Sequence, residues 1–214
     1  MSNEEIMSEP VKSTQSCYHS DPPNHNRRGP TSFWMHDPDI IFQELNLHNG
    51  DVFLDIGSGN GDYTLRAAVE VGNLGIVYAL DVQKDLIYLL NQKAGQIQQD
   101  NIKGIIHDIR KTLPLNDASV DVSFISTVLH VLDSSEYESI LFPELLRVLR
   151  PHGRLVIIEC KKEETPFGPP LSMRISPEEL ETHLAVYGFV KTGYIDLDNN
   201  YLVSFSIQNS SNTA

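Results

Sequence analysis

The fold of this chain is decided by the stretch Val52-Phe53-Leu54-Asp55-Ile56-Gly57-Ser58-Gly59-Asn60-Gly61-Asp62. An apolar run ends in a carboxylate, three glycines follow on alternate positions, and an amphipathic segment begins at once. This order predicts a strand, a tight glycine turn and the N-terminus of a helix. Glycines let a ligand approach the backbone without meeting a Cβ atom, and the helix start offers unpaired N–H groups. We therefore expect a ligand-binding turn at this point.

Strands and helices alternate along the rest of the chain. Apolar periodicity predicts helices over residues 38–47, 62–71, 135–149 and 176–188, and another around Leu86 to Ala94. Strands are predicted over residues 51–56, 75–80, 102–106, 120–125, 154–159, 189–197 and 201–207. Pro143 predicts an irregular first half of its helix, and residues 151–153 predict a turn. This alternation indicates an α/β fold: a parallel sheet with helices on both faces and one antiparallel strand at an edge.

Composition limits the domain organisation and the partners. With 214 residues, the chain is long enough for one α/β domain, which we place at residues 33–208. Residues 1–32 are polar and predict a flexible tail or a lid over the ligand, and residues 209–214 predict a C-terminal tail. The net charge of −13 argues against unaided binding to nucleic acid. We expect no disulfide between Cys17 and Cys160, no metal site, no membrane span and a cytoplasmic location.

Acidic side chains end several of the predicted strands: Asp55, Asp81, Asp108 and Glu159. Ligands of such sheets bind outside the carboxyl ends of the strands, near the point where the strand order reverses. Asp81 is placed to accept hydrogen bonds from a ribose diol, and Asp108 to meet an adenine amino group. Alternatively, both side chains cap the helices that follow them. Their matching positions favour a nucleoside ligand.

Two common nucleotide folds fit the glycine turn poorly. A dehydrogenase has G-x-G-x-x-G, whereas this turn is G-x-G-x-G with Asp55 two residues before it. A carboxylate there repels a pyrophosphate and suits a ligand that carries an ammonium group. A P-loop is excluded because no G-K-[ST] follows.

Together these residues resemble the class I S-adenosylmethionine-dependent methyltransferases. More narrowly, the chain is similar to the type 11 branch, which includes the quinone-biosynthesis C-methyltransferases. The resemblance covers about residues 34–207 and implies a Rossmann-like, seven-stranded sheet in the order 3-2-1-4-5-7-6, with strand 7 antiparallel. It rests on these segments: residues 55–61, Asp81, residues 107–109, residues 121–126 and residues 145–155.

The resemblance also implies a role for individual residues. The glycine turn would pack against the methionine part of S-adenosylmethionine, with Asp55 near its amino group. Asp81, next to Val82, would hold the ribose, and Asp108 with Ile109 would flank the adenine. The full set of expected cofactor residues is Asp55, Gly57, Ser58, Gly59, Gly61, Asp81, Val82, Asp108, Ile109 and Ser126.

The implied reaction is direct displacement at the sulfonium methyl group by an acceptor, with S-adenosylhomocysteine as the product. We expect a small-molecule acceptor; the alternatives are a protein acceptor or a cofactor-binding subunit without activity. A general base is needed only if the acceptor loses a proton, and His130 and Glu159 are the candidates. A packed histidine and a helix cap are the structural alternatives. Trp34 and Arg174 are candidate acceptor contacts, Arg174 for an anionic group. The oligomeric state stays open.

Overall fold

The computed structural model describes residues 32–165 and 168–208. The predicted N-terminal tail or lid falls on residues 1–31 and the C-terminal tail on residues 209–214. Both therefore lie outside the described part, as does Cys17. Ser32, which we assigned to the tail, opens a 3₁₀ turn, η1 (Ser32–Met35).

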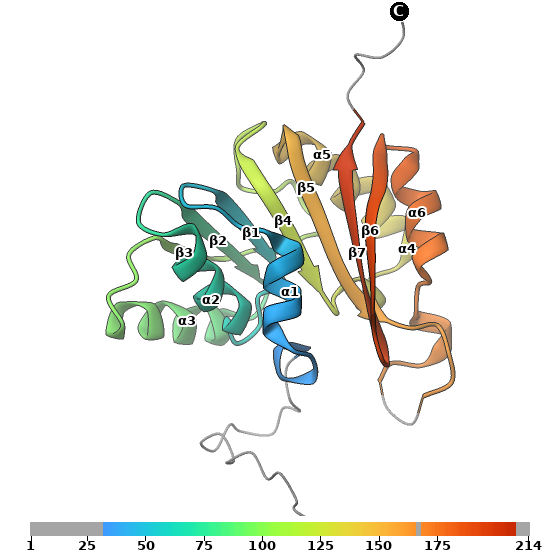
Figure 1. Ribbon diagram of the computed structural model, residues 1–214, viewed down its shortest axis with the longest axis horizontal. Coiled ribbons are helices and arrows are strands. Elements are labelled where there is room, and N and C mark those ends of the chain that lie inside the picture. Colours follow the sequence, from blue (N-terminus) through green and yellow to red (C-terminus); the bar gives the residue numbers. More distant parts are fainter. Residues whose placement is uncertain (1–31, 166–167, 209–214) are drawn as a thin grey trace, which may run out of the picture.

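The described residues form a seven-stranded sheet in the order β3-β2-β1-β4-β5-β7-β6, as the resemblance implied (Figure 1). Strands β1 to β5 run parallel, and β7 is antiparallel to both β5 and β6. The strands are β1 (Val52–Ile56), β2 (Ile76–Asp81), β3 (Ile102–Ile106), β4 (Val120–Ser126), β5 (Leu149–Cys160), β6 (Phe189–Leu197) and β7 (Asn200–Ile207).

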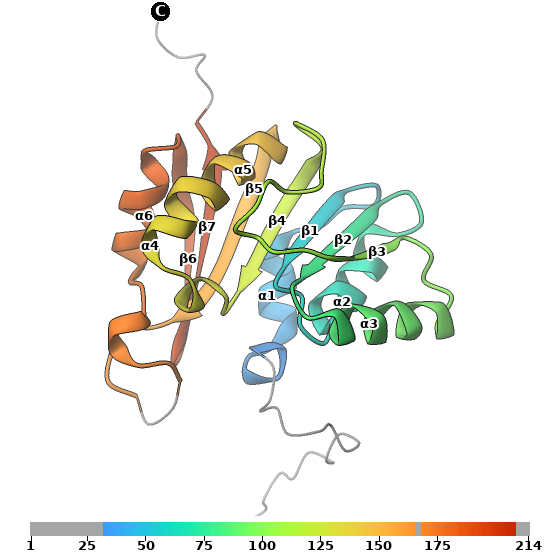
Figure 2. The same cartoon turned by 180° about the vertical axis from the view of Figure 1, so that it is seen from behind.

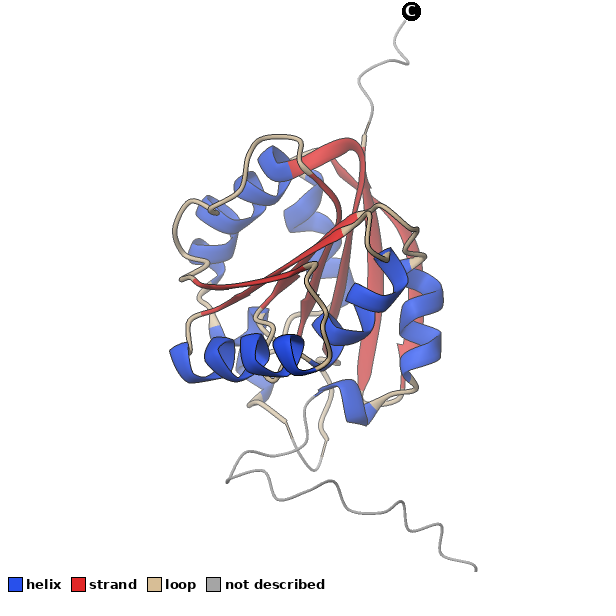
Figure 3. Cartoon of the chain, turned by 90° about the vertical axis from the view of Figure 1, so that its left-hand side faces the viewer, coloured by secondary structure: helices blue, strands red, loops and turns tan. Residues whose placement is uncertain are grey.

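Helices cover both faces of the sheet, as the edge-on view shows (Figure 3). Residues alternate along a strand, so Phe53 belongs to the core layer that includes residues of α1 (Pro38–Leu45) and α2 (Asp62–Val71), while its neighbour Leu54 belongs to the layer that includes residues of α5 (Phe142–Val148) and α6 (Pro177–Ala185). The layer of α5 and α6 is in front in Figure 2. The helices are α1 (Pro38–Leu45), α2 (Asp62–Val71), α3 (Lys84–Gln96), α4 (Ser134–Glu136), α5 (Phe142–Val148) and α6 (Pro177–Ala185).

Local signals explain where the helices begin and bend. The Ser176 side chain accepts from the Glu179 backbone N–H and the Glu179 side chain accepts from the Ser176 N–H, which is the predicted capping box of α6. The predicted irregularity before Pro143 is confirmed. A π-helical turn, η3 (Tyr137–Leu141), separates α4 from α5, since proline has no N–H to donate to the preceding turn.

The predicted turn at residues 151–153 is wrong as a strand boundary, because β5 is continuous from Leu149 to Cys160. The residues form an irregularity within the strand: Val120 pairs with Leu149, but Val122, two residues on, pairs with Arg154. The extra residues bulge out of register, which is the way a strand accommodates a proline.

A transmembrane helix is not found in the described residues, where every helix is too short or too polar to span a bilayer.

Candidate active site

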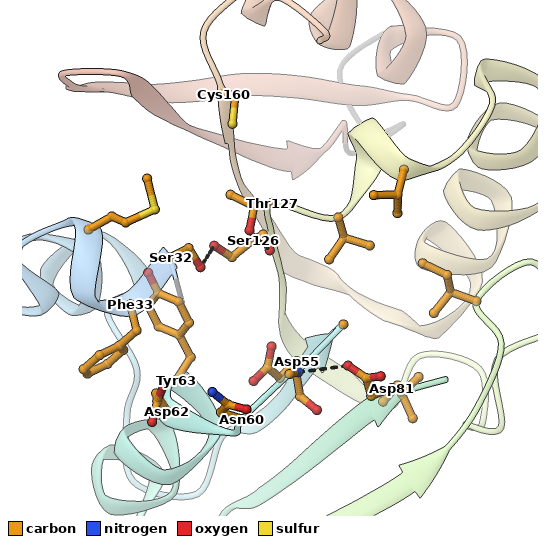
Figure 4. Close-up of a pocket in the computed structure, with 18 of the residues that line it drawn as sticks. Ser32, Phe33, Asp55, Asn60, Asp62, Tyr63, Asp81, Ser126, Thr127 and Cys160 are labelled. Atoms are coloured by element: carbon orange, nitrogen blue, oxygen red, sulfur yellow. Dashed lines mark hydrogen bonds between the residues drawn. The ribbon is translucent and has the colours of Figure 1, made fainter. Parts of the chain in front are cut away.

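A cavity of about 1130 Å³ lies at the carboxyl ends of β1, β2 and β4. Its walls come from the glycine turn, the ends of β2 and β3, the segment after β4, η1 and the β6–β7 hairpin. Figure 4 shows Ser32, Phe33 and Tyr63 on one side of this cavity and Asp81 on the opposite side. Binding pockets for one small ligand typically measure 300–1,000 Å³. The cavity is therefore slightly larger than this range.

The glycine turn has the conformation that its sequence predicts. Gly57, Gly59 and Gly61 have φ angles of 71°, 54° and 79°, in the left-handed region that side chains disfavour. A Cβ atom on Gly57 would lie 2.3 Å from Val128 Cγ2, whereas one on Gly59 would face open space beyond the nearest atom at 3.9 Å. Gly59 therefore presents bare backbone to the cavity.

Gly61 has a different role from the one expected. It does not border the cavity, and its missing Cβ makes room for Leu90 of α3, whose Cδ1 would lie 2.4 Å away. Glycine is needed at this position because the turn packs closely against α3. This packing role replaces the expected role of Gly61 as a cofactor residue.

Asp55 is a buried carboxyl group at the end of β1, with 2 % of its surface exposed. Its Oδ2 accepts from Thr64 Oγ1 at 2.5 Å. Burial raises the pKa of Asp55 to about 7, against the lowering effect of the Thr64 hydrogen bond. A buried carboxylate is stabilised by a cation. The site is thus suited to an ammonium group at this position.

Asp81 connects the glycine turn to β2. Its Oδ2 accepts from the Gly59 N–H at 2.9 Å, and its Oδ1 accepts from the Gln83 N–H at 2.7 Å at the start of α3. Gln83 precedes the first turn of α3, which has no side-chain cap, so Asp81 does not cap this helix in the way the alternative supposed. Each carboxylate oxygen has a second lone pair, and the side chain borders the cavity, so a vicinal diol can still bind there.

Asp108, Val82 and Ile109 border the same end of the cavity. Asp108 is paired with Arg110, whose Nε and Nη2 each donate to it at 2.9 Å. These hydrogen bonds lower the pKa of Asp108 to about 2. The pairing was not expected from the sequence. Together, two apolar side chains and an ionised carboxylate form a slot that is compatible with an adenine ring.

Ser126, at the end of β4, borders the cavity. Its Oγ is 2.8 Å from Ser32 Oγ, which connects η1 to the sheet. Phe33 packs edge-on against Tyr63 with ring centroids 5.0 Å apart. Burial raises the pKa of Tyr63 to about 12, so its hydroxyl stays protonated. These side chains form a wall that excludes water on the side away from Asp81.

The proposed bases His130 and Glu159 pair with each other and do not border the cavity. Glu159 Oε2 lies 2.9 Å from His130 Nδ1, and Glu159 Oε1 accepts from the Leu129 N–H at 2.7 Å. Glu159 has 1 % of its surface exposed. The pair holds the 3₁₀ turn η2 (Leu129–Val131) against the end of β5. Cys160 does border the cavity. Its sulfur lies within 4.8 Å of a ring nitrogen of His130 and of a carboxylate oxygen of Glu159.

The structure also corrects the two expected acceptor contacts. Trp34 is 65 % exposed and does not border the cavity, whereas its neighbours Phe33 and Met35 do. Arg174 is buried and donates to the backbone carbonyls of Pro169, Lys161 and Glu163. These hydrogen bonds hold the loop after β5 in place. The guanidinium therefore points to backbone carbonyls, and the structure does not support its expected contact with an anionic acceptor.

The sequence did not identify several residues that border the cavity. His36 follows η1, and residues 197–200 form the tip of the β6–β7 hairpin. No local motif marks these residues, because they meet the glycine turn only through folding. The hairpin turn itself, Asp198 to Asn200, was predicted, but not its place beside the cavity.

The residues that border the cavity are compatible with S-adenosylmethionine in their charge and polarity. Ser58 Oγ is buried without a hydrogen-bond partner among the described residues, and the backbone at Gly59 is bare. A ligand with a carboxylate, an ammonium group, a diol and a flat base would meet Ser58, Asp55, Asp81 and the slot of Val82 and Ile109 in that order.

Comparison with known proteins identifies the family. A family model described as "Methyltransferase domain" matches residues 47–195. A demethylmenaquinone methyltransferase from Geobacillus sp. (strain WCH70) is 29 % identical over 129 residues, which cover 60 % of this chain and 52 % of that protein. The chain thus spans about half the length of the curated relatives it matches.

Solved structures agree with this assignment. An S-adenosylmethionine-dependent methyltransferase from Aquifex aeolicus is 29 % identical, with a TM-score of 0.74 over 84 % of this chain and 94 % of that one. A structure from Sulfolobus solfataricus, assigned to the type 11 methyltransferases, shares the fold at 22 % identity, with a TM-score of 0.64 over 84 % and 97 % of the two chains. The chain therefore belongs to the methyltransferase domain family, with the fold of the class I S-adenosylmethionine-dependent methyltransferases, and is a distant homologue of the demethylmenaquinone methyltransferases.

Proposed function

We propose that this protein transfers a methyl group from S-adenosylmethionine to a small, uncharged and largely apolar acceptor. The observation that carries the proposal is the composition of the cavity beyond the glycine turn. Its walls there are mostly apolar and include Phe33, Met35, Thr127, Val128, Val131, Leu132, Cys160 and Leu197, next to His36 and the hairpin residues Asp198, Asn199 and Asn200. Among the described residues, Arg110 is the only lysine or arginine that borders the cavity, and it is paired with Asp108.

The two halves of the cavity have different roles. In this proposal Asp55, Asp81 and the glycine turn hold the cofactor, which supplies an electrophilic sulfonium methyl group. The residues around Ser126 and η1 align the acceptor and exclude water, which is the main contribution a protein makes to such a displacement. Demethylmenaquinone, for which the curated relatives are named, is the first compound to test as an acceptor.

The experiment is to incubate the purified full chain with methyl-labelled cofactor and a cell extract, and to separate the small-molecule, protein and nucleic-acid fractions. We expect label in the small molecules. Label only in proteins would favour a protein acceptor instead. Absence of transfer while calorimetry shows saturated cofactor binding would contradict the enzymatic proposal.

Asp81→Ala is the matched variant for this experiment. It removes the acceptor of the Gly59 N–H and the expected ribose contact, so we expect binding of S-adenosylhomocysteine to weaken at least about tenfold, with a matching loss of transfer. Asp85→Ala is the control, since Asp85 is exposed on the first turn of α3 and does not border the cavity. Equal affinity in the two variants would refute the role of Asp81.

A further inference from the structure

His36 is the imidazole placed beside the acceptor half of the cavity. It follows η1 directly, and the hydrogen bond between Ser32 and Ser126 fixes η1 over the end of β4. Its side chain borders the cavity, and its Nε2 is buried without a hydrogen-bond partner among the described residues. A buried imidazole nitrogen without a partner is costly unless a ligand supplies one.

Two other histidines, the candidate base His130 and His107, are placed differently. His130 uses Nδ1 to pair with Glu159 and does not border the cavity. His107 does border it, but it follows β3 beside Asp108, at the end assigned to the adenine. His36 is therefore the imidazole whose free nitrogen and position both suit the acceptor.

We propose that His36 is the general base of the reaction, and that the acceptor is a neutral compound with an ionisable hydroxyl group. This rests on the proposed function. A largely apolar chamber with an imidazole nitrogen in its wall favours a molecule that forms a hydrogen bond to that nitrogen and loses the proton as it is methylated.

The proton balance of the step is complete with groups that the protein and cofactor provide. The acceptor forms a bond to the methyl carbon, the carbon–sulfur bond breaks, and its electrons stay on sulfur as a neutral thioether. The hydroxyl proton passes to Nε2 of His36. The positive charge of the sulfonium thus ends as an imidazolium.

Two features of the surroundings of His36, its burial and the nearby Asp198, fit this role. Burial lowers the pKa of His36, which keeps the imidazole neutral and able to accept a proton, while Asp198 on the β6–β7 hairpin acts in the opposite direction and stabilises the imidazolium. The charged groups that border the same cavity among the described residues are Asp55, Asp62, Asp81, Asp108, Arg110 and Asp198.

The first test measures binding, without turnover. The full chain saturated with S-adenosylhomocysteine is titrated with 2-naphthol and with 2-methoxynaphthalene, which has nearly the same shape but no proton to donate. We expect naphthol to bind about tenfold more tightly, as one buried hydrogen bond allows. In His36→Leu this ratio should fall to about one. The control is His48→Leu, because the His48 side chain is 66 % exposed and lies outside the cavity, and it should keep the ratio.

The second test is label transfer from the cofactor into the small molecules of the cell extract. His36→Gln should reduce transfer at least about 100-fold while its affinity for S-adenosylhomocysteine stays within threefold of wild type, which also shows that the variant folds. A wild-type protein without transfer would overturn the proposed function and this inference with it. Transfer in His36→Gln close to wild type, an unchanged naphthol ratio in His36→Leu, or no naphthol binding would each overturn the role of His36 alone.

Discussion

At the scale of single residues, the site depends on buried polar groups whose hydrogen-bonding and charge requirements the protein's own residues meet only in part. Asp55 is the clearest example, since its carboxyl group is fully inside the fold and has one hydroxyl donor, Thr64. Such a group costs free energy when it ionises, and a ligand with a positive charge recovers that cost.

This predicts a specific dependence of stability on pH. The pKa of Asp55 rises from 3.8 to about 7 in the folded state. Between these values the folded protein binds a proton that the unfolded chain has released, so stability falls as pH rises, by up to about 1.4 kcal/mol per pH unit. Asp108, with a pKa of about 2, titrates below this window.

Asp55→Asn should remove this slope, because the amide keeps an acceptor for Thr64 but does not ionise. Urea unfolding of the variant and of wild type at pH 5, 6, 7 and 8 measures the difference. We expect the stability of the variant relative to wild type to grow from pH 5 to pH 7 and then level off. A constant difference across this range would contradict a buried, protonated Asp55.

Glu159 has a positioning role at the residue scale. Its carboxylate accepts from Leu129 N–H and pairs with His130, and so fixes η2, whose last residue Val131 and preceding residue Val128 line the cavity. Glu159→Ala should cost about 2–3 kcal/mol of stability, since it leaves a buried N–H without a partner. Urea unfolding measures this loss. Glu163→Ala is the exposed control, and an equal effect in both variants would refute the positioning role.

At the scale of elements, the turn between β1 and α2 has the tightest steric requirement. Gly57 combines a left-handed φ of 71° with a Cβ position only 2.3 Å from Val128 Cγ2. Both constraints act together, because the end of β1 must pass close to the segment after β4 for the cavity to form.

Gly57→Ala should therefore destabilise the protein by at least about 2 kcal/mol and weaken cofactor binding. The matched control is Gly95→Ala in α3, where a Cβ would meet nothing within 4 Å. That change should stabilise the protein by about 0.5–1 kcal/mol, the helix preference of alanine over glycine. Denaturant midpoints measure both. If both variants shifted in the same direction, the steric account of Gly57 would fail.

At the scale of the whole molecule, the cavity joins parts of the chain that are far apart in sequence. The glycine turn, the end of β4 and the β6–β7 hairpin all contribute walls. A ligand that fills the cavity therefore holds these parts together and stabilises the folded state as a unit, since it binds the folded protein only.

We expect S-adenosylhomocysteine at 100 times its dissociation constant to add about 2.7 kcal/mol of stability. For a chain of this size, this corresponds to a rise in Tm of about 5–10 °C. Thermal unfolding with and without the ligand measures the shift, and Asp81→Ala should show little of it at the same concentration. An unchanged Tm at a concentration that calorimetry shows to be saturating would contradict binding to this cavity.

The sequence by itself determined the features that depend on neighbouring residues. The glycine turn, the capping box at Ser176, the irregular helix before Pro143 and most element boundaries are set by local sterics and hydrogen bonds, which the spacing of residues records. The strand order followed from the resemblance to a family. The carboxylates at the ends of β1, β2 and β3 were correctly placed together, because parallel strands bring their carboxyl ends to one edge.

Only the tertiary structure decided which side chains reach the cavity. Gly61 packs against α3, Arg174 is turned to backbone carbonyls, and His130 is bonded to Glu159, while His36 enters the site from a segment with no motif of its own. The hydrogen bond that fixes this segment joins Ser32 to Ser126, 94 positions away. Contacts of that range arise from packing of the two helix layers on the sheet, and no local pattern in the chain encodes them.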